Sequence, residues 1–228
     1  MIFFDIDQTL LDHAGAANKS ILSLTRQRLG EKVDDESRLI REWQSISDKY
    51  YAAYLTGAMS FELQRRARMD GLFGLYGQSL TKTEADRLFD TFLETYEQNW
   101  ETFPDVLSCL NKLADAGYRL GIISNGNMNQ QIQKLQALKL RGYFSVVVAS
   151  GEIHISKPDP RIFQEACRRG GVELSECIYI GDSYETDAVG SKAAGMKGIW
   201  LNRDGQDLSS VAEDIPMIRS LGELQASI

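Results

Sequence analysis

The sequence contains no run of about 18 consecutive apolar residues, so a membrane-spanning helix is not expected. Only three of its 228 residues are cysteines, and none of them, Cys109, Cys167 and Cys177, belongs to a CxxC pair. Because they also lie far apart in the sequence, neither a disulfide framework nor a zinc site is predicted. The residues after Met1 lack the basic leader and cleavage site of a signal peptide, so we expect a reducing, cytoplasmic location.

Positive charge is also scarce, with 25 lysines and arginines against 32 aspartates and glutamates, a net charge of −7. Nucleic-acid polymers and anionic membranes are bound by basic faces, so neither kind of partner is expected. An anionic small molecule would have to be neutralised by a few local cations or by a bound metal. The hydrophobic content of 43% and the chain length suit one core with a smaller second domain, and they leave the oligomeric state open.

Short apolar runs alternate with helical patterns over most of the chain. Each run ends in polar or glycine-containing turns, which is typical of strands buried on both faces. The alternation predicts an α/β fold, a Rossmann-like, doubly wound parallel sheet with helices on both faces. The predicted strands span residues 2–6, 118–123, 144–149, 177–180 and 198–201, and the predicted helices span residues 104–116, 128–138, 160–169 and 185–194.

The alternation is interrupted after the first strand, where roughly ninety residues contain no strand-like run. Apolar residues there recur at helical spacing over residues 20–29, 37–55, 61–75 and 83–100. We therefore predict an α-helical cap domain over residues 13–102, inserted into a core domain formed by residues 1–12 and 103–228.

Carboxylate, hydroxyl and amine side chains are concentrated just after the predicted strands, at the edge where open parallel sheets bind ligands. Several carboxylates at one place repel one another unless a cation lies among them. Oxygen ligands favour a hard ion such as Mg²⁺, so a magnesium site is predicted. The residues concerned are Asp5 and Asp7 after the first strand, Ser124 and Asn125 after the second, Lys157 after the third, and Asp182 and Asp187 after the fourth.

In the order of these motifs the chain resembles the haloacid dehalogenase-like superfamily. The motifs are DxDxT from Asp5 to Thr9, a hydroxyl at Ser124, an amine at Lys157 and GDxxxxD from Gly181 to Asp187. The longer matches KPDPRIF and GDSYETDAVGSKAAGM extend the resemblance over nearly the whole core. It implies a magnesium-dependent phosphatase that hydrolyses a small phosphate monoester and makes residues 1–12 and 103–228 its catalytic core.

The resemblance also implies a role for each motif residue. Asp5 is the nucleophile that becomes an aspartyl phosphate, and Asp7 protonates the leaving alcohol and then activates water. Thr9 braces the first loop. The phosphoryl oxygens are bound by Ser124 and the backbone amide of Asn125, Lys157 neutralises the nucleophile and phosphate, and Mg²⁺ is held by Asp5, the Asp7 carbonyl and Asp182, with Asp187 beside or just behind them.

One position departs from the family pattern, because Gln8 stands where a glycine is usual. The fine shape of the first loop is therefore open, and Gln8→Gly is predicted to leave an active enzyme.

Haloacid dehalogenases of the superfamily have no aspartate at the second motif position, so Asp7 argues against that activity. A phosphomutase shares all four motifs and stays open. A phosphonate hydrolase would need a reactive cap lysine, whereas Lys19, Lys49 and Lys82 lie in polar surroundings.

A phospho-accepting signalling or binding domain is the alternative from a different functional class, but such domains have no large insertion after the first strand.

The sequence indicates the substrate less clearly than the reaction type. The stretch around Asp12 and His13, and residues 56–68, look like pyrimidine 5′-nucleotidases, so a nucleoside 5′-monophosphate is one candidate. Sugar phosphates and phosphoglycolate are the others. Tyr50, Tyr51, Tyr54, Phe61 and Phe73 would either stack a base or form the interior of the cap.

Overall fold

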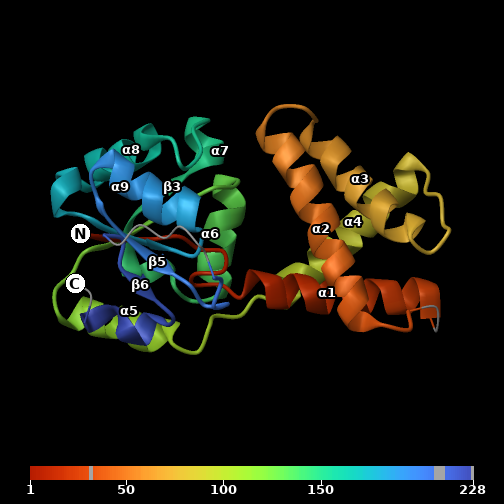
Figure 1. The fold of residues 1–228 in the computed structure, drawn as a ribbon, viewed down its shortest axis with the longest axis horizontal. Helices are drawn as coiled ribbons and strands as arrows, with labels where there is room; N and C mark the ends of the chain where they lie inside the picture. The colour runs from red at the N-terminus through yellow and green to blue at the C-terminus, as the bar shows by residue number, and fades with distance from the viewer. Residues whose placement is uncertain (31–32, 208–213, 227–228) are drawn as a thin grey trace. The chain divides into compact units, whose positions relative to one another are not determined.

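The computed structural model describes residues 1–30, 33–207 and 214–226 and divides the chain into two compact units (Figure 1). One unit consists of Met1–His13 and Trp100–Ile228, and the other of Ala14–Asn99. We call them the core unit and the helical unit. The predicted domains also include residues 31–32, 208–213 and 227–228, which lie outside the described residues.

The core unit contains a six-stranded, fully parallel sheet in the order β3-β2-β1-β4-β5-β6. Strand β1 lies at its centre, where Ile2 is paired with Leu120 on one side and Ile178 on the other. The predicted α/β fold with a doubly wound parallel sheet is confirmed. The strands are β1 (Ile2–Phe4), β2 (Leu120–Ser124), β3 (Phe144–Ala149), β4 (Ile178–Gly181), β5 (Lys197–Leu201) and β6 (Met217–Ile218).

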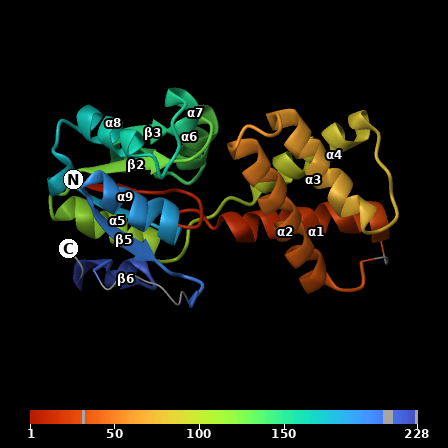
Figure 2. The same ribbon diagram turned by 45° about the horizontal axis from the view of Figure 1, so that its top comes forward.

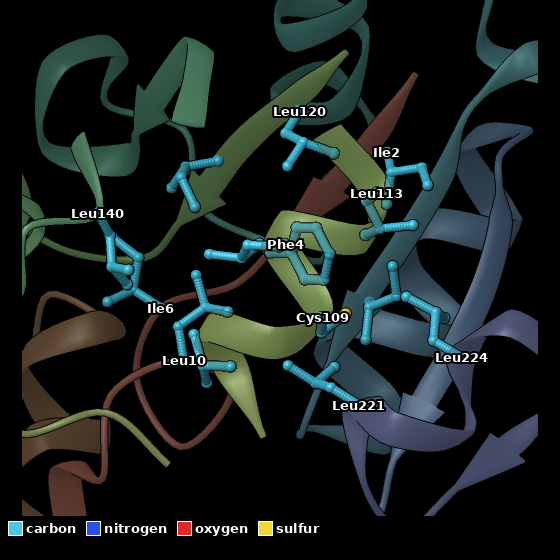
Figure 3. Close-up of a cluster of buried hydrophobic side chains, with 14 of the residues drawn as sticks. Ile2, Phe4, Ile6, Leu10, Cys109, Leu113, Leu120, Leu140, Leu221 and Leu224 are labelled. Atoms are coloured by element: carbon cyan, nitrogen blue, oxygen red, sulfur yellow. The ribbon is translucent and has the colours of Figure 1, made fainter. Parts of the chain in front are cut away.

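Side chains of the central strand alternate between the two faces of the sheet, as the pleat requires. Ile2 and Phe4 enter a core cluster on the face covered by helix α5 and a short C-terminal helical segment, as Figure 3 shows. Phe3 enters the opposite cluster, which is covered by α8. The helical elements are α5 (Val106–Asp115), α6 (Met128–Ala137), α7 (Ser150–Ile153), α8 (Pro160–Gly170) and α9 (Gly190–Ala194), the 3-10 turns Arg141–Tyr143, Leu174–Glu176 and Leu221–Ala226, and a π-helical stretch, Tyr184–Val189.

Some element boundaries differ from the sequence prediction. Strand β2 begins at Leu120 rather than at Tyr118, which is 42% exposed and follows the left-handed turn at Gly117. The helix predicted over residues 185–194 is a π-helical stretch followed by α9. Strand β6 was missed because its two residues are too short for an alternating pattern.

The helical unit contains four helices among its described residues, and Figure 2 shows them from a second direction. They are α1, which begins at the end of the core unit (His13–Leu29), α2 (Glu36–Leu55), α3 (Phe61–Gly74) and α4 (Lys82–Gln98). The N-terminal ends of α2, α3 and α4 are capped by the side chains of Asp35, Ser60 and Thr81. In the described part of the chain, none of the helices has the length and apolar composition needed to cross a membrane.

Aromatic side chains form the interior of the helical unit. The rings of Trp43 and Phe92 lie 5.0 Å apart in an edge-to-face arrangement. Phe73 is fully buried, so it belongs to this interior rather than to a surface that stacks a base. Tyr51 and Phe61 are 36% and 48% exposed, so these two rings remain accessible.

The structure also shows that two of the cysteines lie close together. Cys167 and Cys177 are ten residues apart in sequence, but their sulfur atoms lie 3.5 Å apart in the core unit. Both are free, buried thiols. Burial raises the pKa of each thiol, to about 12 for Cys167.

Candidate active site

The loop after β1 turns sharply to place two carboxylates at the edge of the sheet. Asp5 continues the β1 backbone, because its amide donates to the Ile180 carbonyl at 2.9 Å. Gln8 adopts the left-handed conformation, with φ of 60°, and its amide donates to Leu11 at 2.9 Å. That conformation suits glycine better than glutamine, which explains why a glycine is usual at this position.

Thr9, predicted to brace this loop, is fully buried. Its carbonyl oxygen accepts a hydrogen bond from Arg203 at 3.0 Å, and its hydroxyl lies 3.5 Å from Asp182 Oδ1. Arg203 is itself held by Asp105 through two contacts of 2.9 Å. The loop is therefore tied to the segment after β5, a contact that the sequence prediction missed.

Lys157 lies at the centre of a buried network of charges. Its Nζ donates to Asp5 Oδ1 at 2.8 Å, to Asp187 Oδ1 at 2.7 Å and to Tyr179 Oη at 2.7 Å. Burial alone would lower the pKa of the lysine, but Asp187 and Asp5 outweigh burial and raise it. Asn125 fixes the lysine backbone through two hydrogen bonds of 2.8 and 3.0 Å. Lys157 therefore stays positively charged beside the Asp5 carboxylate.

Asp5, Asp182 and Asp187 form the candidate metal centre, since one oxygen from each lies within 4.8 Å of the others. Gly181 permits this approach, because a side chain there would collide with the Asp187 carboxylate. Burial raises the pKa of Asp5 to about 6 and that of Asp182 to about 8, and repulsion among the carboxylates adds to both shifts. Such a cluster resists full ionisation without a further cation. The purely oxygen donor set fits a hard ion such as Mg²⁺.

Asp7 is held by a different lysine. Lys134 Nζ, on α6, donates to Asp7 Oδ1 at 2.7 Å and to Oδ2 at 2.8 Å. Gln131 Nε2 lies 3.4 Å from Asp7 Oδ2 and 3.2 Å from the hydroxyl of Ser124, which is 1% exposed. His13 Nδ1 lies 3.8 Å from Asp7 Oδ1. Burial would raise the pKa of Asp7, but Lys134 and His13 outweigh it and lower the pKa.

The structure thus brings the predicted residues into two connected groups. Asp5, Lys157, Asp182 and Asp187 form one group, and Asp7 and Ser124 are joined through Gln131. The sequence prediction missed Gln131 and Lys134. A signal for them was present, because two polar residues three apart lie on the same helical stripe as Leu135.

Comparisons with known proteins decide the family. The family model for haloacid dehalogenase-like hydrolases matches residues 2–201. The chain belongs to this family. The predicted family and the prediction of an enzyme are therefore confirmed.

Named relatives in this family cover nearly the whole chain. The chain is 29% identical to human N-acylneuraminate-9-phosphatase, covering 99% of this chain and 92% of that protein. It is 31% identical to glyceraldehyde 3-phosphate phosphatase of Methanothermobacter thermautotrophicus, covering 89% and 85%. It is 28% identical to pyrimidine 5′-nucleotidase YjjG of Escherichia coli, covering 98% and 95%. Two of these relatives are phosphatases by name and the third is a nucleotidase, and their names give different substrates.

Solved structures share the fold. The hydrolase YfnB from Bacillus subtilis superposes with a TM-score of 0.83 at 21% identity, covering 99% of this chain and 96% of that one. A 2-haloacid dehalogenase from Pseudomonas syringae superposes with a TM-score of 0.64 at 27% identity, with the same coverage. A dehalogenase therefore shares the fold, so the fold alone does not separate a phosphatase from a dehalogenase, and the residues of the site must do so.

Proposed function

We propose that the protein is a magnesium-dependent phosphatase that hydrolyses a small phosphate monoester through an aspartyl phosphate on Asp5. The observation that carries the proposal is that each of the two aspartates is bound by a different lysine. Lys157 binds Asp5, and Lys134 binds Asp7. Two neighbouring carboxylates in different surroundings are suited to different roles, one as nucleophile and the other as proton carrier.

Asp5 is suited to nucleophilic attack. Among the described residues, hydrogen bonds to its carboxylate engage Oδ1, which leaves Oδ2 for the bond to phosphorus. In the first step Oδ2 bonds to phosphorus while the bond from phosphorus to the ester oxygen breaks. Lys157 neutralises charge at Oδ1 throughout. When bound, Mg²⁺ would supply positive charge for the phosphoryl oxygens and would be held by Asp5, the Asp7 carbonyl and Asp182, with Asp187 beside them.

Asp7 is suited to moving the protons. Lys134 and His13 favour the carboxylate form of Asp7 in the free protein, and the negative charge of the bound phosphate is proposed to oppose them, so that Asp7 is protonated in the substrate complex. In the first step this carboxylic acid gives a proton to the departing ester oxygen, which leaves as an alcohol. In the second step its carboxylate takes a proton from water as the water oxygen bonds to phosphorus and Asp5 is released. Ser124 and the Asn125 amide, at the end of β2, are proposed to bind the phosphoryl oxygens. The helical unit is proposed to act as the cap that limits access of bulk water.

The dehalogenase alternative is disfavoured by Asp7, because a halide ion leaves without a proton donor beside the nucleophile, whereas an alcohol needs one. A phosphomutase would use the same residues and differ in whether water reaches the aspartyl phosphate. For the substrate, a nucleoside 5′-monophosphate is favoured by the likeness to the nucleotidase of Escherichia coli. A sugar phosphate is favoured equally by the likeness to the two other relatives.

Release of phosphate from p-nitrophenyl phosphate tests the proposal. We expect activity with Mg²⁺, loss of activity with a chelator and a fall of at least about a thousandfold in Asp5→Asn, because the nucleophile is removed. Asp115→Asn, at an exposed position of α5, is the matched control and should retain full activity. A folded wild-type protein without activity, or an active Asp5→Asn variant, would contradict the proposal.

A panel of nucleotides, sugar phosphates and phosphoglycolate separates the substrate classes. A kcat/KM advantage of about tenfold for sugar phosphates corresponds to about 1.4 kcal/mol of transition-state binding. Such an advantage over every nucleotide would exclude the nucleotidase assignment.

A further inference from the structure

Lys134 is a buried amine in the site whose purpose the phosphatase motifs do not explain. We infer that Lys134, assisted by Gln131, is a positioning residue that orients the Asp7 carboxylate for proton transfer to the leaving oxygen. The inference rests on the proposed phosphatase function, because it concerns a step of that reaction. It assigns a role to helix α6, which carries none of the four motifs.

The first support is the register of α6. Gln131 and Lys134 are 1% and 3% exposed and lie on the same side of the helix as Leu135, which is buried in the core. The helix is therefore anchored by its apolar contacts while its polar side chains reach the end of the sheet. A side chain carried by an anchored helix is held more narrowly than one carried by a loop.

The second support is the geometry at Asp7. Both carboxylate oxygens accept from one amine, at 2.7 and 2.8 Å, which fixes the direction and the plane of the carboxylate. Gln131 contacts the same carboxylate and the Ser124 hydroxyl, so it connects the proton carrier to the predicted phosphate-binding group. Space for Gln131 depends on Gly126, since a Cβ there would lie 2.5 Å from Gln131 Nε2.

The third support is the unequal burial of the pair. The Lys134 side chain is 3% exposed, whereas the Asp7 side chain is 27% exposed. One side of Asp7 is therefore held from within the protein while the other remains accessible to a reactant. Lys157 cannot take the place of Lys134, because its Nζ is engaged by Asp5, Asp187 and Tyr179.

Leaving groups of different basicity test the inference. An alkyl phosphate such as glycerol 2-phosphate must have its leaving oxygen protonated, whereas p-nitrophenolate leaves without much help. The value of kcat/KM reports the steps up to the first phosphoryl transfer, so it isolates this difference. We therefore compare both substrates for the wild type, Lys134→Met, Lys134→Arg and Gln131→Leu.

In Lys134→Met, kcat/KM should fall about a hundredfold for the alkyl phosphate, because a poorly oriented Asp7 loses most of the contribution of general acid catalysis even though loss of the lysine charge makes it easier to protonate. For p-nitrophenyl phosphate it should fall less than about tenfold, and Lys134→Arg should recover part of the alkyl activity. Gln131→Leu should show the same selectivity with a smaller loss. Lys112→Met, at an exposed position of α5, is the matched control and should change neither value.

Equal losses on both substrates in a folded Lys134→Met protein would overturn the inference, because a merely structural role lowers both rates together. Unchanged rates would also overturn it. If Lys134→Met does not fold by circular dichroism, the substrate ratios of Lys134→Arg and Gln131→Leu decide in its place. A wild-type protein inactive on both substrates would instead overturn the proposed phosphatase function.

Discussion

The core unit and the helical unit differ in where they place interacting charges. The core unit has exposed ion pairs, such as Lys192 with Asp214, but it also has buried ones, Lys157 with Asp5 and Asp187 and Lys134 with Asp7. In the helical unit the ion pairs that the structure describes lie at the surface, as in Arg66 with Asp86. Buried charge is costly to keep, so its concentration in the core unit supports the candidate active site there.

The helical unit is instead held together by its apolar interior. The partial exception is Arg68, whose guanidinium lies 4.6 Å from the Trp43 ring, and burial lowers its pKa to about 10. A unit that depends on aromatic packing can change its surface charges at little cost. This difference explains why the sequence shows recognisable motifs in the core unit and none in the helical unit.

The largest effect is expected on breaking the buried network with Lys157→Met. Two buried carboxylates would lose their cation, so the free energy of unfolding should fall by about 3–5 kcal/mol, and phosphatase activity should fall by about a hundredfold or more. Urea unfolding and steady-state kinetics measure the two effects. Lys192→Met, which removes an exposed ion pair with Asp214, is the control and should cost less than about 1 kcal/mol. Similar costs for both variants would contradict the contrast between buried and exposed charge.

In the helical unit, the corresponding large effect should come from an apolar residue. Trp43 is 2% exposed, and Trp43→Ala should lower the free energy of unfolding by about 3–5 kcal/mol through lost burial and a cavity. Leu63, on α3, is 49% exposed, so Leu63→Ala should change it by no more than about 0.5 kcal/mol. Urea unfolding followed by circular dichroism compares the two variants. A loss below about 1 kcal/mol in Trp43→Ala would show that the aromatic interior does not stabilise this unit.

An intermediate effect should come from Mg²⁺ and should depend on pH. Without metal, Asp5 and Asp182 have pKa values raised from 3.8 to about 6 and about 8, so the folded protein binds more protons than the unfolded chain. Their contribution to stability is therefore lost as pH rises from about 4 to about 8. Mg²⁺ competes with these protons, so the stabilisation that it provides should grow over the same range.

Thermal unfolding with and without Mg²⁺ at pH 5 and pH 8 measures this effect. A concentration of 100 times Kd would stabilise the protein by about 2.7 kcal/mol, or about 5–10 °C in Tm for a chain of this length. Asp182→Asn should abolish most of the shift, because it removes one proposed ligand. A shift of equal size at both pH values would mean that the metal does not bind to these carboxylates.

The same contrast shows how far the sequence could predict the structure. Residues at the ends of long apolar strands were identifiable, because strand and turn patterns place Asp5, Ser124 and Asp182 at one edge of the sheet. Gln131 and Lys134 were not identified, since polar residues in a helix are usually solvent-facing, and their shared stripe with Leu135 does not by itself show that the tertiary structure buries them. Contacts made through packing of distant segments, such as Arg203 with Thr9, leave no local pattern at all.

A smaller effect is expected at Gln8, where a glutamine adopts a backbone conformation that suits glycine better. The left-handed conformation costs a glutamine about 1–2 kcal/mol relative to glycine, and part of this is offset because glycine makes the unfolded chain more flexible. Gln8→Gly should therefore raise the free energy of unfolding by about 0.5–1 kcal/mol and leave an active enzyme. Urea unfolding and the p-nitrophenyl phosphate assay check both. Destabilisation would show that side-chain contacts of Gln8 outweigh the backbone cost.

The smallest effect should come from an ion pair of the helical unit. Arg66 Nε lies 2.7 Å from Asp86 Oδ1, and Nη2 lies 2.8 Å from Oδ2, so the geometry is good. The side chains are nevertheless 33% and 42% exposed, and solvent screening should limit the loss in Arg66→Ala to about 0.2–1 kcal/mol. A double-mutant cycle with Asp86→Ala isolates the pair, and salt should weaken the coupling. A coupling above about 2 kcal/mol would mean that the helical unit, like the core unit, depends on charge for its stability, and the distinction between the two units would no longer hold.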